Sequence, residues 1–253
     1  MFRFWRRKRR LMVDCVTASE KGLVRKENQD SFFVDESKTV FCVADGMGGG
    51  AEGATASRIV CEEVGKAVAD TENLVERMRA VVAAIGAANG RIRSYAGGKG
   101  FKLMGSTLAA LLVDPDDSRR AAICHVGDSR IYRVRQGKVT LLTHDHTIGG
   151  QLSTFVPGAL TAGMKRRSHP LAHVLTRAIG AEEKVTGEWR RIDLAAGDRY
   201  LVCSDGVHDA VADPRIGEIL TSERDLSSAS KQLGDEVVRK GAPDNYTFVI
   251  IDV

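Results

Sequence analysis

The segment Val40–Gly50 reads Val-Phe-Cys-Val-Ala-Asp-Gly-Met-Gly-Gly-Gly, and it decides the fold. Its unbroken apolar run predicts a buried strand that ends in the acidic residue Asp45. The glycines that follow predict a tight turn at which the backbone can come close to a ligand. The segment Tyr200–Val207 repeats this design, with Asp205 and Gly206 after the apolar run. Two carboxylates at the ends of core strands indicate a site that is built on a rigid scaffold.

The chain as a whole has the composition of a soluble globular protein, with 43% hydrophobic and 28% charged residues among its 253. That length suits one large domain or two small ones. Neither a linker nor an internal repeat divides it, so we expect a single domain over residues 11–253. The apolar stretch Leu11–Val13 stops at Asp14, which does not fit a signal peptide. No apolar run in the sequence reaches transmembrane length, and we expect a cytoplasmic protein.

The basic charge of the chain is concentrated in residues 1–10, MFRFWRRKRR, which hold six Lys or Arg and no acid. The formal net charge is +4, so residues 11–253 carry a net charge of −2. A short basic terminus is most often a solvated tail. The alternative is a surface anchor, in which Phe2, Phe4 and Trp5 and the basic side chains touch an anionic membrane or nucleic acid. We expect at most a weak membrane contact, and no nucleic-acid partner.

Five cysteines are scattered through the sequence, and most lie in apolar, strand-like runs. Their number is odd, their spacing is wide and no Cys-x-x-Cys pair occurs. We therefore predict buried free thiols in a reducing compartment, rather than disulfides or a zinc site. The residues concerned are Cys15, Cys42, Cys61, Cys124 and Cys203.

Short strands and grouped helices are predicted along the chain. Alternating and apolar runs predict strands at Leu11–Ser19, Phe32–Val34, Thr39–Ala44, Ser106–Val113, Ala121–Val126, Arg130–Arg135, Lys138–Leu142, Val185–Leu194, Asp198–Cys203 and Tyr246–Val253. Apolar residues at helical spacing predict helices at Ala51–Asp70, Glu72–Tyr95, Leu171–Ile179, Pro214–Leu220 and Leu226–Lys240. Residues 144–170 have no clear period, which is typical of a functional or mobile segment. Because the helices do not alternate strictly with the strands, we expect an α+β fold with antiparallel sheets.

Aspartates recur at predicted strand ends and tight turns, and most adjoin a glycine or a proline. Carboxylates that converge repel one another, and a hard divalent cation relieves that repulsion. Oxygen-only ligands suit Mg²⁺ or Mn²⁺ rather than Zn²⁺. A single Asp-Gly pair is more often a simple turn, but its repetition after apolar runs favours a metal site. The residues are Asp30, Asp45, Asp128, Asp205 and Asp244.

Six short motifs occur in one order, and together they extend over nearly the whole chain. They are Arg25-x-x-Asn28-Gln29-Asp30, Ala44-Asp45-Gly46-Met47-Gly48-Gly49, Gly105-Ser106-Thr107, His125-Val126-Gly127-Asp128-Ser129-Arg130, Ser204-Asp205-Gly206 and Asp244-Asn245-x-Thr247. This set resembles the bacterial metal-dependent protein phosphatases of the protein phosphatase 2C type. The resemblance implies a four-layer sandwich, in which two central antiparallel β-sheets are flanked by helices on both outer faces. It also implies one phosphatase catalytic domain over residues 11–253, with a flap at about residues 144–172.

The resemblance assigns roles in metal binding to particular residues. It implies that Asp45 bridges two core ions, Mn²⁺ or Mg²⁺, and that the carbonyl of Gly46 is a second ligand of one of them. Asp205 and Asp244 match the remaining carboxylates of the first ion. Asp30 matches a residue that holds the second ion through water.

The resemblance also implies a reaction. Asp128 matches a ligand of a third, weaker ion, and Arg25 matches the arginine that grips the substrate phosphate. A hydroxide that bridges the two core ions would attack phosphoserine or phosphothreonine in line. The implied enzyme is a monomeric serine/threonine phosphatase that opposes a bacterial protein kinase, with phosphorylated proteins as partners. The alternative is a pseudophosphatase that binds phosphoproteins without catalysis; loss of a core aspartate would favour it, and none is missing.

The sequence departs from the family pattern at two places, and two motifs have a second interpretation. Gln29 stands where many members have glutamate, so it brings no charge to the second ion. Met47 stands where eukaryotic members have a histidine proposed as general acid, and methionine cannot donate a proton.

The sequence His144-Asp145-His146 resembles a transition-metal clamp, but a connecting segment of the family matches it better. In the flap, Lys165-Arg166-Arg167 indicates either a solvated loop or contact with acidic phosphopeptides.

Overall fold

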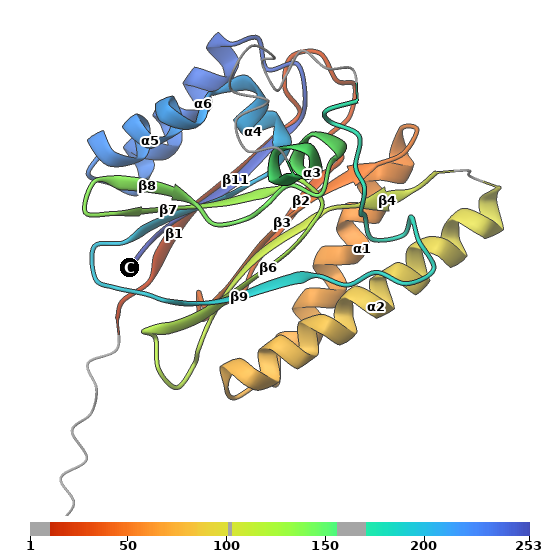
Figure 1. Ribbon diagram of the computed structural model, residues 1–253, viewed down its shortest axis with the longest axis horizontal. Coiled ribbons are helices and arrows are strands. Elements are labelled where there is room, and N and C mark those ends of the chain that lie inside the picture. Colours follow the sequence, from red (N-terminus) through yellow and green to blue (C-terminus); the bar gives the residue numbers. More distant parts are fainter. Residues whose placement is uncertain (1–10, 101–102, 156–170) are drawn as a thin grey trace, which may run out of the picture.

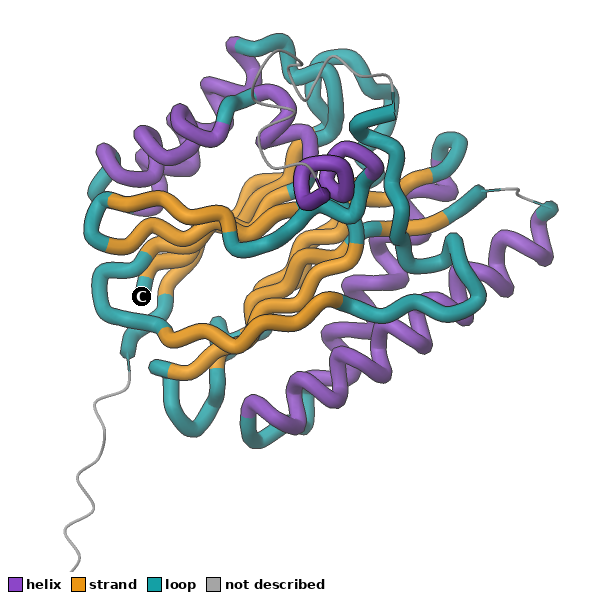
Figure 2. Tube along the Cα trace, in the orientation of Figure 1, coloured by secondary structure: helices purple, strands orange, loops and turns teal. Residues whose placement is uncertain are grey.

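The computed structural model describes residues 11–100, 103–155 and 171–253 (Figure 1). Two antiparallel sheets pack face to face, and helices cover the outer face of each (Figure 2). The predicted α+β sandwich of four layers is therefore confirmed. No described helix is both long and apolar enough to span a lipid bilayer. Residues 1–10 and the predicted contact residues 165–167 lie outside the described part of the chain.

Each sheet combines strands that are distant in the sequence. One sheet has the order β1-β11-β10-β7-β8 and is formed by Asp14–Glu20, Tyr246–Asp252, Arg199–Cys203, Arg130–Arg135 and Lys138–Leu141. The other has the order β2-β3-β5-β6-β9 and is formed by Asp30–Val34, Val40–Met47, Leu108–Val113, Arg120–Val126 and Glu188–Asp193, with β4 (Gly105–Ser106) beside β3. The ten predicted strands are confirmed in place, apart from shifts at their ends, except that the predicted strand Ser106–Val113 is divided between β4 and β5.

Strand β3 is apolar at every position from Val40 to Ala44 because both of its faces are buried. Phe41 and Val43 face the other sheet and belong to the core between the sheets. Cys42, like its even-numbered neighbours, faces the helices. Successive side chains of a strand point to opposite faces, so a strand in the middle of a four-layer sandwich cannot alternate apolar with polar residues. The apolar run from Val40 to Ala44 therefore reflects the burial of both faces of β3.

The helices divide between the two outer faces. Helices α1 (Ala51–Val68) and α2 (Leu74–Lys99) pack on the sheet that contains β3, while α5 (Asp213–Ser222) and α6 (Leu226–Arg239) cover the other sheet (Figure 1). The side chain of Asn73 caps α2 by accepting a hydrogen bond from the backbone N–H of Glu76. These four helices confirm the predicted ones within a few residues at each end.

Some predictions were wrong. Leu171–Ile179 is not helical; instead it forms isolated bridges, from Leu175 to Thr147 and from Ile179 to Ser106. The segment that lacked a clear period contains helix α3 (Ile148–Phe155). A short helix α4 (Asp205–Ala210) was not predicted. The five cysteines are free, as expected, and four of them are buried.

Candidate metal centre and active site

Asp30 and Asp45 are brought together by strand pairing. In the pairing of β2 with β3, the two residues lie directly opposite each other. The backbone N–H of Asp45 donates to Oγ1 of Thr107 (2.9 Å), and its carbonyl accepts from the N–H of Thr107 (2.8 Å). Strand β3 continues to Met47, so Asp45 lies inside the strand rather than at its end as the sequence had indicated. The backbone that carries the Asp45 carboxylate is therefore held on one side by strand β2 and on the other by Thr107.

Asp205 and Asp244 come from the other sheet. Asp205 is the first residue of α4 and is separated from β10 by Ser204 alone, and Asp244 precedes β11. Strands β10 and β11 are neighbours, so the two residues reach the same end of the sheet. The hydroxyl of Ser204 donates to Oδ2 of Asp30 at 2.7 Å and so links the two sheets. The candidate site lies at this junction.

A cavity of about 230 Å³ opens at the junction. Six of the seven predicted site residues line it: Arg25, Asp45, Gly46, Asp128, Asp205 and Asp244. Asp30, the seventh, is 8% exposed and lies next to the cavity, opposite Asp45. Gln29, Met47 and His173 also line the cavity. The structure therefore brings together every residue that the resemblance assigned to the site.

The glycines after two of the aspartates are required by close packing of the backbone. A Cβ atom added to Gly46 would lie 1.9 Å from the carbonyl oxygen of Gly53. One added to Gly206 would lie 1.9 Å from the carbonyl oxygen of Asn245. Both contacts are far shorter than any side chain tolerates. The repeated Asp-Gly pairs thus reflect two places where the chain passes close to another backbone segment beside a carboxylate.

The carboxyl groups of the cavity are buried against one another, and their protonation reflects this. Burial, followed by the negative charges of Asp30 and Asp205, raises the pKa of Asp45 well above its usual value. Burial is also the main cause that raises the pKa of Asp128 well above its usual value and the pKa of Asp205. For Asp30, burial raises the pKa to about 7. The site therefore concentrates negative charge that its protein surroundings do not offset.

The donor set fits hard divalent cations. The aspartates and the backbone of Gly46 offer oxygen atoms as ligands, which is the ligand type of Mg²⁺ and Mn²⁺. Within the described part of the chain, Oδ1 of Asp30 is buried without a hydrogen-bond partner. Nη2 of Arg25 lies 2.6 Å from Oδ2 of Asp244, but one guanidinium cannot balance the whole cluster. Divalent cations would relieve the remaining repulsion.

We expect the metal-free protein to be less stable at pH 8 than at pH 6. The folded pKa of Asp30 is raised from 3.8 to about 7, so its stabilising contribution is present at low pH and is lost as the pH rises through 7. The loss between these two pH values is about 1 kcal/mol for this group. Thermal unfolding in EDTA at both pH values measures it. Added Mn²⁺ should remove the difference, because the cation binds the ionised carboxylates; a metal-free protein that is more stable at pH 8 would contradict this.

A second cluster, His125, His146 and Glu188, resembles a transition-metal site but is occupied by hydrogen bonds. Its possible ligand atoms lie within 4.8 Å of one another. Nδ1 of His146 accepts from the N–H of Gly127 (3.1 Å), so the proton of the neutral ring sits on Nε2, which lies 3.2 Å from Oε2 of Glu188. Burial lowers the pKa of His146 to about 4, which keeps the ring neutral. Nε2 therefore has no lone pair for a metal, and the connecting-segment interpretation is favoured.

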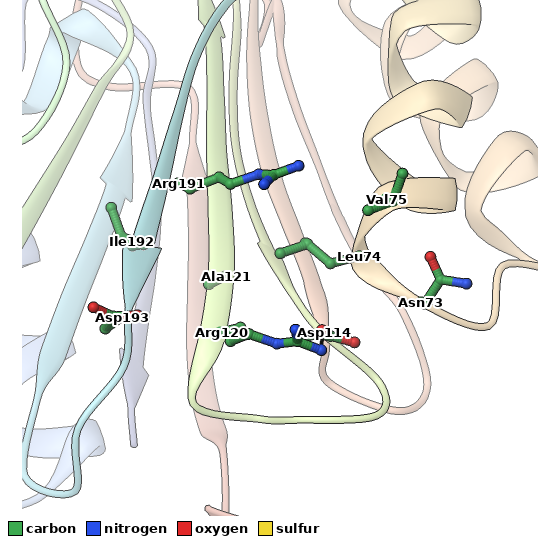
Figure 3. Close-up of a pocket in the computed structure, with 9 residues that line it drawn as sticks. All are labelled: Asn73, Leu74, Val75, Asp114, Arg120, Ala121, Arg191, Ile192 and Asp193. Carbon is green, nitrogen blue, oxygen red and sulfur yellow. Dashed lines mark ion pairs between the residues drawn. The ribbon is translucent and has the colours of Figure 1, made fainter.

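A larger cavity, of about 480 Å³, lies away from this site between the start of α2 and strands β6 and β9 (Figure 3). Its wall holds Asp114, which forms an ion pair with Arg120 at 2.7 Å. The guanidinium of Arg191 extends from β9 toward Val75 of α2 (Figure 3). This cavity has no converging set of carboxylates, so size does not identify the metal centre here.

Sequence patterns missed His173 and Asp209. His173 lies in the segment wrongly predicted as a helix, and it enters the cavity wall because that segment bridges back to Thr147 and Ser106. Nδ1 of His173 lies 3.4 Å from Oδ2 of Asp209, which is in helix α4. Neither residue lies in one of the six motifs, so only the tertiary structure could reveal the pair.

The comparisons with known proteins agree with this geometry. Residues 24–241 match the family model of protein phosphatase 2C. The chain is 34% identical over 245 residues to the serine/threonine protein phosphatase PstP of Mycobacterium tuberculosis, and the match covers 96% of this chain and 45% of PstP. The chain thus spans about half the length of that relative.

Solved structures give the same result. The S. agalactiae serine/threonine phosphatase matches with a TM-score of 0.86 and 29% identity, over 96% of this chain and 100% of that one. The catalytic domain of the serine/threonine phosphatase PstP, in complex with two manganese ions, matches with a TM-score of 0.81 and 31% identity, over 95% and 97%. By its sequence match, its fold and the gathering of its six motifs at one cavity, the chain belongs to the protein phosphatase 2C family.

Proposed function

We propose that this protein is a metal-dependent phosphatase that hydrolyses phosphoserine and phosphothreonine in proteins. The observation that carries the proposal is the convergence of Asp45, Asp205 and Asp244 on one cavity with Arg25. The family relatives named as serine/threonine phosphatases, and the two manganese ions of the PstP structure, support it.

The residues of the cavity would have two roles in catalysis: some would hold the metal ions, and Arg25 would bind the phosphate. When bound, two divalent cations supply a nucleophilic water near neutral pH and neutralise charge on the phosphate. Asp45, placed between the two sheets, would contact both ions; Asp205 and Asp244 would complete the set around one of them, and the carbonyl of Gly46 would serve the other. The side chain of Arg25 is 55% exposed at the edge of the cavity. Its planar fork suits two phosphate oxygens and would orient the phosphorus for attack.

Other aspects of the function belong to the same proposal. Asp30 would hold an ion through water, and Asp128, which also lines the cavity, would hold a weaker third ion. Either Mn²⁺ or Mg²⁺ fits the oxygen donors. We propose a cytoplasmic, monomeric enzyme whose substrates are a serine/threonine kinase or the proteins it phosphorylates, without nucleic acid. Residues 1–10 would add a weak contact with a membrane surface.

The pseudophosphatase alternative is less favoured, because all the carboxylates of the cavity are present. The test is phosphate release by the purified protein from a phosphothreonine peptide and from p-nitrophenyl phosphate. We expect release with Mn²⁺ and none with EDTA. Tight binding of the phosphopeptide without hydrolysis of either substrate would overturn the proposal in favour of the binding module.

A further inference from the structure

His173 stands where two cavities meet. It lines the 230 Å³ cavity together with Arg25 and Asp45, and it also lines a neighbouring cavity of about 330 Å³. Asp128 is a further residue shared by both walls. The side chain of His173 is 51% exposed, so a substrate that enters the site from solvent can reach the ring.

Asp209 orients this histidine. Its Oδ2 lies 3.4 Å from Nδ1 of His173. Asp209 and Asp205 are both in helix α4, so one short rigid element supports both the carboxylate at the cavity and the partner of the histidine. A carboxylate beside one ring nitrogen fixes the orientation of the ring and holds a proton on that nitrogen. Nε2, on the opposite side of the ring, is the nitrogen that remains for a substrate.

The reaction needs a proton donor, and the aspartates that line the cavity are assigned to the metal ions. The leaving group of a phosphoserine or phosphothreonine is an alkoxide, a strong base that must take up a proton. Met47 lines the cavity but has no proton to give, and the guanidinium of Arg25 does not release one. Nε2 of His208, in the neighbouring cavity, lies 3.0 Å from the backbone oxygen of Asp128 and donates to it. Among the described residues that line the site and have no assigned metal ion, His173 is the one whose ring nitrogen can donate a proton to a bound substrate.

We propose that His173 is the general acid that protonates the leaving group, with Asp209 as its positioning residue. The inference rests on the proposed function. A water molecule gives up one proton to solvent, and its oxygen forms a new bond to phosphorus as the bond between phosphorus and the serine or threonine oxygen breaks. The electron pair of the broken bond takes the proton on Nε2 of the imidazolium, and the products are the free hydroxyl and inorganic phosphate. Solvent then returns a proton to the ring, so atoms and charge balance.

The test compares leaving groups that need a proton with one that does not. 4-Nitrophenolate is stable as an anion, whereas phenolate and the alkoxide of threonine are stronger bases. We expect His173→Asn to lower kcat on a phosphothreonine peptide by about 100-fold, the usual contribution of a general acid, and to lower kcat on phenyl phosphate as well. Activity on p-nitrophenyl phosphate should stay close to wild type. The matched control is His144→Asn, an exposed histidine outside both cavities, which should change none of the three rates.

A second variant distinguishes the loss of a proton donor from a change in the structure of the site. In His173→Ala, added imidazole should restore hydrolysis of the phosphothreonine peptide, as expected for a missing proton donor. Equal losses on all three substrates, or no loss on any, would overturn the role of His173 while leaving the phosphatase function intact. If the wild-type protein hydrolyses none of the three with Mn²⁺, the proposed function itself fails, and the role of His173 fails with it.

Discussion

Asp45→Asn is expected to abolish phosphatase activity, lowering kcat on a phosphothreonine peptide by about 10³-fold or more. Bound metal ions supply several kcal/mol of transition-state stabilisation, and about 1.4 kcal/mol corresponds to tenfold in rate. Burial raises the pKa of Asp45 well above its usual value, and the negative charges of Asp30 and Asp205 raise it further. The amide removes the central charge that would hold both ions, without changing the size of the side chain. Initial rates at saturating Mn²⁺ measure the effect.

Asp116→Asn is the matched control for that variant. Asp116 is an exposed residue of the turn between β5 and β6 and lines none of the cavities described above. The same chemical change there should leave the rate within about twofold of wild type, since surface substitutions have small effects. Asp45→Asn should retain its fold, as judged by circular dichroism. An Asp45→Asn protein that is folded and fully active would contradict the assignment of this residue.

Arg130→Met is expected to reduce the free energy of unfolding by about 3–5 kcal/mol, as is usual when one partner of a buried ion pair is removed. Arg130 and Asp145 are 8% and 6% exposed and form a two-pronged pair at 2.8 and 2.7 Å. The guanidinium also donates to the hydroxyl of Tyr132 (3.0 Å) and to Asp213 (3.2 Å). Methionine keeps the apolar stem but leaves the carboxylate of Asp145 buried without its cation. Urea unfolding monitored by fluorescence measures the change.

Lys231→Met tests whether burial is the cause. Lys231 pairs with Asp235 one turn along helix α6, and both side chains are exposed. An exposed pair of this kind contributes only about 0.3–0.5 kcal/mol, so this variant should unfold close to the wild-type midpoint. If Arg130→Met were no more destabilising than Lys231→Met, the buried network of Arg130, Asp145 and Tyr132 would not contribute to stability as described.

Much of the fold followed from local sequence patterns. Strand β3 has an apolar run because both its faces are buried, and β10 repeats the pattern in the other sheet for the same reason. The helical stripe of α1 and the strands from β5 to β8 have periods that local rules capture. The metal-site residues were found through their order along the chain, and the structure brings them to one cavity.

The remaining features depend on contacts that local patterns do not contain. Leu171–Ile179 has helical spacing, but its backbone hydrogen-bonds to residues 146–149 and to Ser106, which are distant in the sequence. Tertiary pairing of this kind overrides local propensity. Helix α4 is too short for a periodic signal. His173 could not be predicted because it lies beside Asp209 only through the tertiary path of Leu171–Ile179, and no motif marks it.

The most direct test of the central assignment is anomalous X-ray diffraction at the manganese absorption edge, on crystals grown with Mn²⁺. We expect two strong peaks at the cavity, one contacted by Asp45, Asp205 and Asp244, and the other by Asp45 and the carbonyl of Gly46. A weaker peak beside Asp128 would mark the third ion. The absence of a peak between these residues, or a dominant peak at His125, His146 and Glu188 instead, would contradict the account.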